Sequence, residues 1–296
     1  MRRYSVLLIL LAALSGCLAP PIRPPAAETV DMRTVLVIPV EPPPLEVSPD
    51  LIESRLPIYR QHDTVPFDLF LERKIYRNPG GVMIAGLVAH DDIVPEMVTR
   101  RAPMTTSSIP GLQSAKALGE NWVPTFALAR EAVSQLMSGG LEAVASGHYY
   151  PLPLAPNERT ANLAFWRGAI RDWYNQDTSP VDYRLHGPGR IDAVLEVGIG
   201  TYRIFEAQAP LQVLVKLIDP VSRKVIGRTA AEAFPVEGTA PELLAREAEK
   251  FKQLVSTVGA KLIEQSLSDL GLPVTRSVRQ DERSTETAVA DGISTL

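Results

Sequence analysis

The stretch from residue 191 to residue 270 constrains the fold more than any other part of the chain. It contains three runs with strand composition, at 193–205, 210–218 and 225–234. In the second run Leu211, Val213, Val215 and Leu217 alternate onto one face, and Leu214 and Ile218 make the other face partly apolar. Residues 219–224 favour a turn, so we expect the last two runs to form an antiparallel hairpin over 209–234.

A long helix is predicted directly after this hairpin. Thr239 and Glu242 have the spacing of a capping box, and Gly271 with Pro273 marks the end. Between them runs an apolar stripe of helical period, made by Leu244, Phe251, Val255, Val258 and Leu262. The pattern therefore predicts a sheet covered on one face by a C-terminal helix.

The preceding part of the chain adds further elements of both kinds. Strands are expected at 34–40, 82–89 and 141–144, and helices at 124–137 and 157–174. The segment 41–123 is broken by proline and is expected to be largely irregular, with a possible helix at 67–76. The predicted fold class is α/β of the α+β type, a mixed or antiparallel sheet packed by helices. We expect a single domain over 34–271 and a disordered tail over 272–296.

The N-terminus has the anatomy of a secretory signal. Arg2 and Arg3 are followed by an apolar run over 6–14 and then by the small residues Ser15 and Gly16. The apolar run is well short of the roughly 20 residues that a transmembrane helix needs.

Leu14, Ser15, Gly16 and Cys17 resemble the lipobox of bacterial lipoproteins. The resemblance implies cleavage between Gly16 and Cys17, attachment of diacylglycerol to the Cys17 thiol, and acylation of the new N-terminus. Because the next residue is Leu18 and not Asp, it further implies the outer membrane, on the periplasmic side. A Pro-rich tether over 17–33 would then separate the body from the lipid. The alternatives are an ordinary signal peptide with a chance cysteine, or a buried N-terminal helix.

Charge and cysteine content exclude some classes of function. Of the 30 basic side chains, loss of residues 1–16 removes Arg2 and Arg3, so 28 remain against 34 acidic ones, a formal charge of −6. This balance argues against a nucleic-acid partner. Cys17 is the only cysteine, so no disulfide can form within the chain.

No familiar catalytic constellation occurs in the sequence. Gly198 and Gly200 lie inside a strand pattern, which indicates a bulge or close packing and not a nucleotide site. His90, Asp91 and Asp92 are adjacent and cannot all face one metal ion without an irregular loop, and His148 is expected in a surface loop. Trp166 and Trp173 are expected in the core. The sequence thus predicts no catalytic residue, no cofactor and no metal site.

The body of the chain resembles the curli-secretion lipoprotein and related envelope-assembly lipoproteins. The similar segments are 193–202 (AVLEVGIGTY) and 211–226, although 220–223 (PVSR) replaces the usual Thr-Gly turn and 41–123 has no counterpart. The resemblance implies a compact α/β domain that acts through protein contacts. We therefore expect a non-catalytic accessory, assembly or secretion factor with envelope proteins as partners, and oligomerisation stays open. The contact surface would be 41–123 or an exposed strand edge. The alternative is an envelope enzyme or ligand binder for cell-wall or lipid material, in which His90, Asp91, Asp92 or His148 converge.

Overall fold

The computed structural model describes residues 18–48, 62–72, 82–89, 111–118, 122–155, 163–185, 189–205 and 207–274. Its strands are β1 (Thr34–Pro39), β2 (Leu45–Ser48), β3 (His62–Glu72), β4 (Val82–Ala89), β5 (Gln113–Ser114), β6 (Glu142–Ala145), β7 (His148–Tyr149), β8 (Ala193–Phe205), β9 (Leu211–Ile218) and β10 (Val225–Ala233). Its helices are α2 (Ala26–Val30), α3 (Pro124–Ser138), α4 (Leu163–Asn175) and α5 (Ala240–Asp269), with short 3₁₀ turns at Ala115–Leu118 and Tyr183–Leu185.

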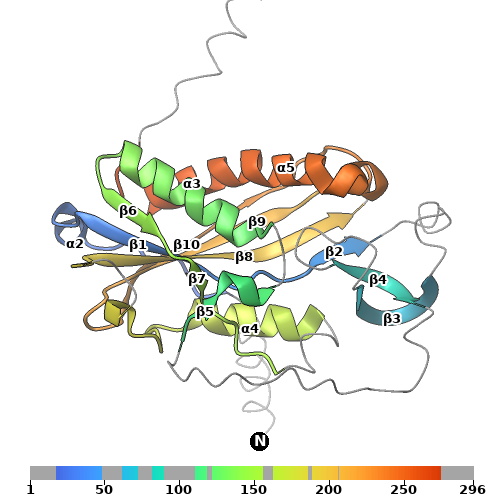
Figure 1. Ribbon diagram of the computed structural model, residues 1–296, viewed down its shortest axis with the longest axis horizontal. Coiled ribbons are helices and arrows are strands. Elements are labelled where there is room, and N and C mark those ends of the chain that lie inside the picture. Colours follow the sequence, from blue (N-terminus) through green and yellow to red (C-terminus); the bar gives the residue numbers. More distant parts are fainter. Residues whose placement is uncertain are drawn as a thin grey trace, which may run out of the picture.

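The molecule has three layers. A mixed sheet lies in the middle, α3 and α5 cover one face, and α4 covers the other (Figure 1). This arrangement confirms the predicted fold class. The predicted hairpin is β9–β10, whose antiparallel register runs from Val225 opposite Ile218 to Ala233 opposite Leu211.

The long strand β8 organises the sheet. Along one edge it pairs antiparallel with β9, from Val194 opposite Ile218 to Tyr202 opposite Leu211. Its other edge pairs in parallel first with β1 and then with β2, so β1 and β2 form one interrupted strand beside β8. The interruption contains three consecutive prolines, at 42–44, which have no N–H to donate to a ladder.

The sheet divides at this interruption. Beyond β1 lies β6, in parallel. Beyond β2 lies β4, also in parallel, and β4 pairs antiparallel with β3. The described parts of the segment 41–123, which was expected to be largely irregular, contain the four strands β2 to β5, and the helix suggested at 67–76 is wrong for residues 67–72. Pairing of β3 with β4 decides this conformation, which a local pattern cannot reveal.

Two apolar cores flank the sheet. Leu211, Val213, Val215 and Leu217 belong to the core beneath α3 and α5, as their alternation predicted. Helix α5 begins after Thr239, whose N–H donates to the Glu242 carboxylate at 3.3 Å. The second core lies beneath α4 and contains Trp166 and Trp173, as expected. Among the helices that the structure describes, none combines the length and apolar character needed to cross a membrane.

Residues 18–33, expected to be a tether, lie against the body. The Ala19 N–H donates to Asn175 Oδ1 at 2.6 Å. Ile22 and Arg228 exchange two backbone hydrogen bonds of 2.8 and 2.9 Å, which adds a pairing at the edge of β10. Met32 is buried in the core beneath α5. These contacts hold the segment on the body, whereas the proline content had predicted a semi-extended tether.

Candidate functional site

Three charged residues lie side by side on the α4 face of the sheet. Glu196 of β8 is opposite Lys216 of β9, and Lys216 is opposite Arg228 of β10. Their exposed fractions are 0%, 0% and 2%. Since charged side chains are almost never fully buried without partners, each is expected to have a compensating group.

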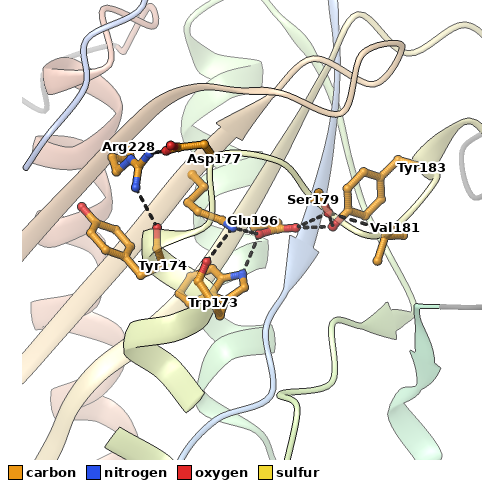
Figure 2. Close-up of polar contacts among 9 residues, drawn as sticks. Trp173, Tyr174, Asp177, Ser179, Val181, Tyr183, Glu196 and Arg228 are labelled. Carbon is orange, nitrogen blue, oxygen red and sulfur yellow. Dashed lines mark hydrogen bonds and ion pairs between the residues drawn. The ribbon is translucent and has the colours of Figure 1, made fainter. Parts of the chain in front are cut away.

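Glu196 is compensated by four donors. The Lys216 ammonium lies 3.2 Å from its carboxylate, and Trp173 Nε1 donates to it at 2.6 Å. The Tyr183 and Ser179 hydroxyls donate to the other carboxylate oxygen (Figure 2). Burial and the neighbouring Glu196 raise the pKa of Tyr183 well above its ordinary value of 10.0, so Tyr183 stays a donor at neutral pH.

The two cations meet the C-terminal end of α4. Lys216 donates to the Trp173 carbonyl at 2.9 Å, and Arg228 donates to the Tyr174 carbonyl at 3.2 Å (Figure 2). Arg228 also pairs with the carboxylate of Asp177, just past the helix end. Carbonyls in the last turn lack intrahelical partners and carry the negative end of the helix dipole. The charges therefore hold α4 against the sheet, with Glu196, Lys216 and Arg228 buried and Asp177 at the surface.

The glycines predicted to mark a bulge or close packing lie beside this network. A Cβ on Gly198 would lie 2.7 Å from Cη2 of Trp173, so a larger residue would displace the indole. The β8–β9 register shifts between Ile199 and Tyr202, next to Gly200. Both predictions for these glycines, close packing at Gly198 and a bulge at Gly200, are confirmed.

An open cavity of about 680 Å³, here called the α4 pocket, lies further along the same face. It is bounded by the N-terminal half of α4 and by the far ends of β8, β9 and β10. Its charged lining consists of Glu46, Arg167, Arg171, Arg203 and Glu232. Apolar side chains in the lining include Leu18, Trp166 and Phe234. Arg167 pairs with Glu46 at 2.9 Å, whereas the buried Nε of Arg203 has no hydrogen-bond partner.

The structure describes only some of the site residues that the sequence predicted. Gly16 and Cys17, together with His90, Asp91 and Asp92, lie outside the described residues, so their assignments stay predictions. His148 is exposed in β7, and its backbone N–H donates to Ser146 Oγ at 3.0 Å. In the described ranges no three His, Cys, Asp or Glu side chains are grouped so that they could hold a metal ion.

Sequence reasoning missed both the charge network and the α4 pocket. A signal for the network exists, because Glu196, Lys216 and Arg228 are charged residues within strand runs, on the face opposite to the main core. The α4 pocket has no such signal, since its residues come from segments far apart in the chain.

No protein-family model and no curated protein sequence matches this chain. Solved structures with some likeness include the PelC dodecamer from Paraburkholderia phytofirmans, at 16% identity over 49% of this chain and 74% of that one, with a TM-score of 0.28. Protein XCC0632 from Xanthomonas campestris matches at 11% identity over 85% and 93%, with a TM-score of 0.33. Lipoprotein GNA1162 from Neisseria meningitidis matches at 16% identity over 77% and 94%, with a TM-score of 0.22. At such scores nothing known of these proteins is carried over.

Proposed function

We propose that this protein is a lipid-anchored envelope lipoprotein, held at the periplasmic side of the outer membrane, that acts without catalysis through contacts with other envelope proteins. The observation that carries the proposal is the motif of residues 14–17, with a signal-like segment before it and the only cysteine at its end. A non-catalytic role is supported by the charge network, in which Glu196, Lys216 and Arg228 are buried and hold α4 on the sheet.

The edge of β6 is the contact surface that the described fold supports best. The N–H groups of Glu142 and Ser146 donate to carbonyls at Arg33 and Val37, on the β1 side. Because alternate residues of a strand direct their N–H groups to opposite edges, Ala143 and Ala145 direct theirs away from β1. No strand in the described part of the chain pairs with that outer edge. Such an edge can accept a strand from a partner.

The anchor is tested by replacing Cys17. In wild type we expect the N-terminal peptide of the mature protein to carry the mass of a triacylated cysteine, and the protein to fractionate with outer membranes. In Cys17→Ala we expect neither. An unmodified cysteine in wild type, or unchanged fractionation of the variant, would show that Cys17 is not a lipid anchor.

The β6 edge is tested by crosslinking in cells. A photo-crosslinking residue replaces the exposed Val144, or, as a control, the exposed Thr257 on α5. We expect position 144 alone to give an adduct with a discrete envelope protein. Ala145→Pro, which removes an outward N–H, should abolish the adduct, whereas Ala145→Ser should keep it. Adducts that are the same from both positions would contradict the assignment.

The alternative is an envelope enzyme or ligand binder for cell-wall or lipid material. The arginine-lined α4 pocket is the observation that favours ligand binding.

A further inference from the structure

The first described residue of the chain lies in the wall of the α4 pocket. Leu18 is part of the pocket lining, and the next residue, Ala19, is held by its hydrogen bond to Asn175 at the end of α4. The pairing of Ile22 with Arg228 fixes the path a few residues later. Leu18 and Ala19, which directly follow Cys17 in the sequence, are thus fixed at the pocket wall and at the end of α4.

Exposed aromatic side chains lie near the same pocket. Phe165 comes from α4, and Phe234 follows β10 and lines the pocket; they are 45% and 59% exposed. Phe205, at the end of β8, is 42% exposed, and alternation places it on the same face of β8 as Arg203. Exposed aromatic residues next to basic ones are the composition of surfaces that lie in a membrane interface.

The charges of the pocket suit a phosphate. Arg167, Arg171 and Arg203 outnumber the two acids, Glu46 and Glu232, and Glu46 is already paired with Arg167. Arg171 pairs with the exposed Asp172 at 3.5 Å. The buried Nε of Arg203 is an unused donor. A guanidinium binds phosphate with fixed, bidentate geometry, which an ammonium group cannot do.

We propose that the α4 face rests on the membrane that holds the lipid anchor, and that the α4 pocket binds the phosphate of an anionic phospholipid headgroup. This inference rests on the proposed acylation of Cys17. A phospholipid of the same membrane is the fitting occupant because Leu18, the residue that follows the proposed anchor in the sequence, lines the pocket. The lipid tails would contact Phe165, Phe205 and Phe234.

Orientation is tested with the full acylated protein in phosphatidylethanolamine vesicles. Since an acylated Cys17 is unreactive, a single new thiol can carry an environment-sensitive fluorophore, at Phe165→Cys or at Thr257→Cys on the opposite layer. We expect a blue-shifted emission from position 165 and an aqueous emission from position 257. Equal emission from both positions would overturn the orientation.

Headgroup binding is tested by thermal unfolding of the same protein in neutral detergent, with phosphatidylglycerol, phosphatidylethanolamine or inorganic phosphate added. Phosphatidylglycerol alone should raise Tm, because a ligand of the folded state stabilises it. Arg171→Gln and Arg203→Gln should each raise the phosphatidylglycerol concentration needed for half of the shift by about fivefold. The charge-matched control Lys261→Gln, on the exposed side of α5, should not.

Two outcomes would overturn the headgroup site. Either phosphatidylglycerol causes no shift, or inorganic phosphate causes the same shift, in which case the pocket takes free phosphate. The mass of the N-terminal peptide separates this inference from the proposed function. An acylated Cys17 without a lipid-dependent shift removes the headgroup site alone, whereas an unmodified Cys17 removes the anchor.

Discussion

At the scale of single residues, the buried pair of Glu196 and Lys216 is the feature with the largest consequence. Removing two charges from water is expensive, and the cost is offset only when both find close partners. Here the Glu196 carboxylate has four donors. The Lys216 ammonium contacts this carboxylate, the Trp173 carbonyl and the Trp173 ring, whose centroid is 5.0 Å from Nζ. Loss of either residue would leave the other charge buried and uncompensated.

Lys216→Met is therefore expected to lower the free energy of unfolding by about 3–5 kcal/mol. Chemical denaturation monitored by circular dichroism measures this loss. Glu196→Gln and the double variant complete a cycle, in which the two single losses should deviate from additivity by about 0.5–3 kcal/mol. Lys261→Met, an exposed lysine on α5, should stay within about 0.5 kcal/mol of wild type. Additive losses would mean that the two groups do not compensate each other.

At the scale of elements, the packing of α4 on β8 requires a glycine, with no side chain, at position 198. Trp173 of α4 is fully buried against Gly198, and the ring occupies the place that a Cβ would take. Helix α4 contains a glycine of a different kind. Around Gly168 nothing lies within 4 Å of the position of an added Cβ. The two glycines form a matched pair, one required by packing and one not.

Gly198→Ala is expected to destabilise the protein by about 1–3 kcal/mol, since the methyl group overpacks the core beneath α4. Gly168→Ala is expected to stabilise it by about 0.5–1 kcal/mol, because alanine loses less conformational freedom in a helix. Thermal and chemical unfolding of both variants give the comparison. A neutral Gly198→Ala would show that the indole relaxes at little cost.

At the scale of the whole molecule, buried tyrosines link stability to alkaline pH. Burial raises the pKa of Tyr150, Tyr183 and Tyr202, and it raises that of Tyr174 to about 12. These residues come from both sides of the sheet, Tyr202 beneath α5 and the others beneath α4. A folded-state pKa above the unfolded value of 10.0 means that the folded state holds its proton more tightly.

The stability contributed by this linkage is complete below pH 10.0 and is lost as the pH rises from there through the folded pKa. We therefore expect the urea midpoint to be steady near neutral pH and to fall above pH 10.0. For Tyr174 the window is between 10.0 and about 12. Tyr174→Phe should flatten the fall in this window and cost little at neutral pH, since the buried Tyr174 hydroxyl has no hydrogen-bond partner. A slope unchanged in Tyr174→Phe would contradict the linkage.

Much of the fold could be predicted from the sequence because the signals are local. Strand alternation at 211–217 and the apolar stripe of α5 act over a few residues, and each agrees with the structure. The conformation of β3 could not be predicted, because the strand depends on pairing with β4. The proline content of 18–33 predicted an extended segment, but neither helix α2 at Ala26–Val30 nor the pairing of Ile22 with Arg228, which is more than 200 residues away.

The sequence by itself determined the class of fold, the order of the main elements and the motif that ends at Cys17. The tertiary structure alone decided which charges meet, where the α4 pocket lies and that Leu18 is part of its wall. The physical reason is separation along the chain. Periodicity and capping are set by neighbours, whereas the ion pair, the pocket and the docked N-terminal segment join residues that only folding brings within contact distance.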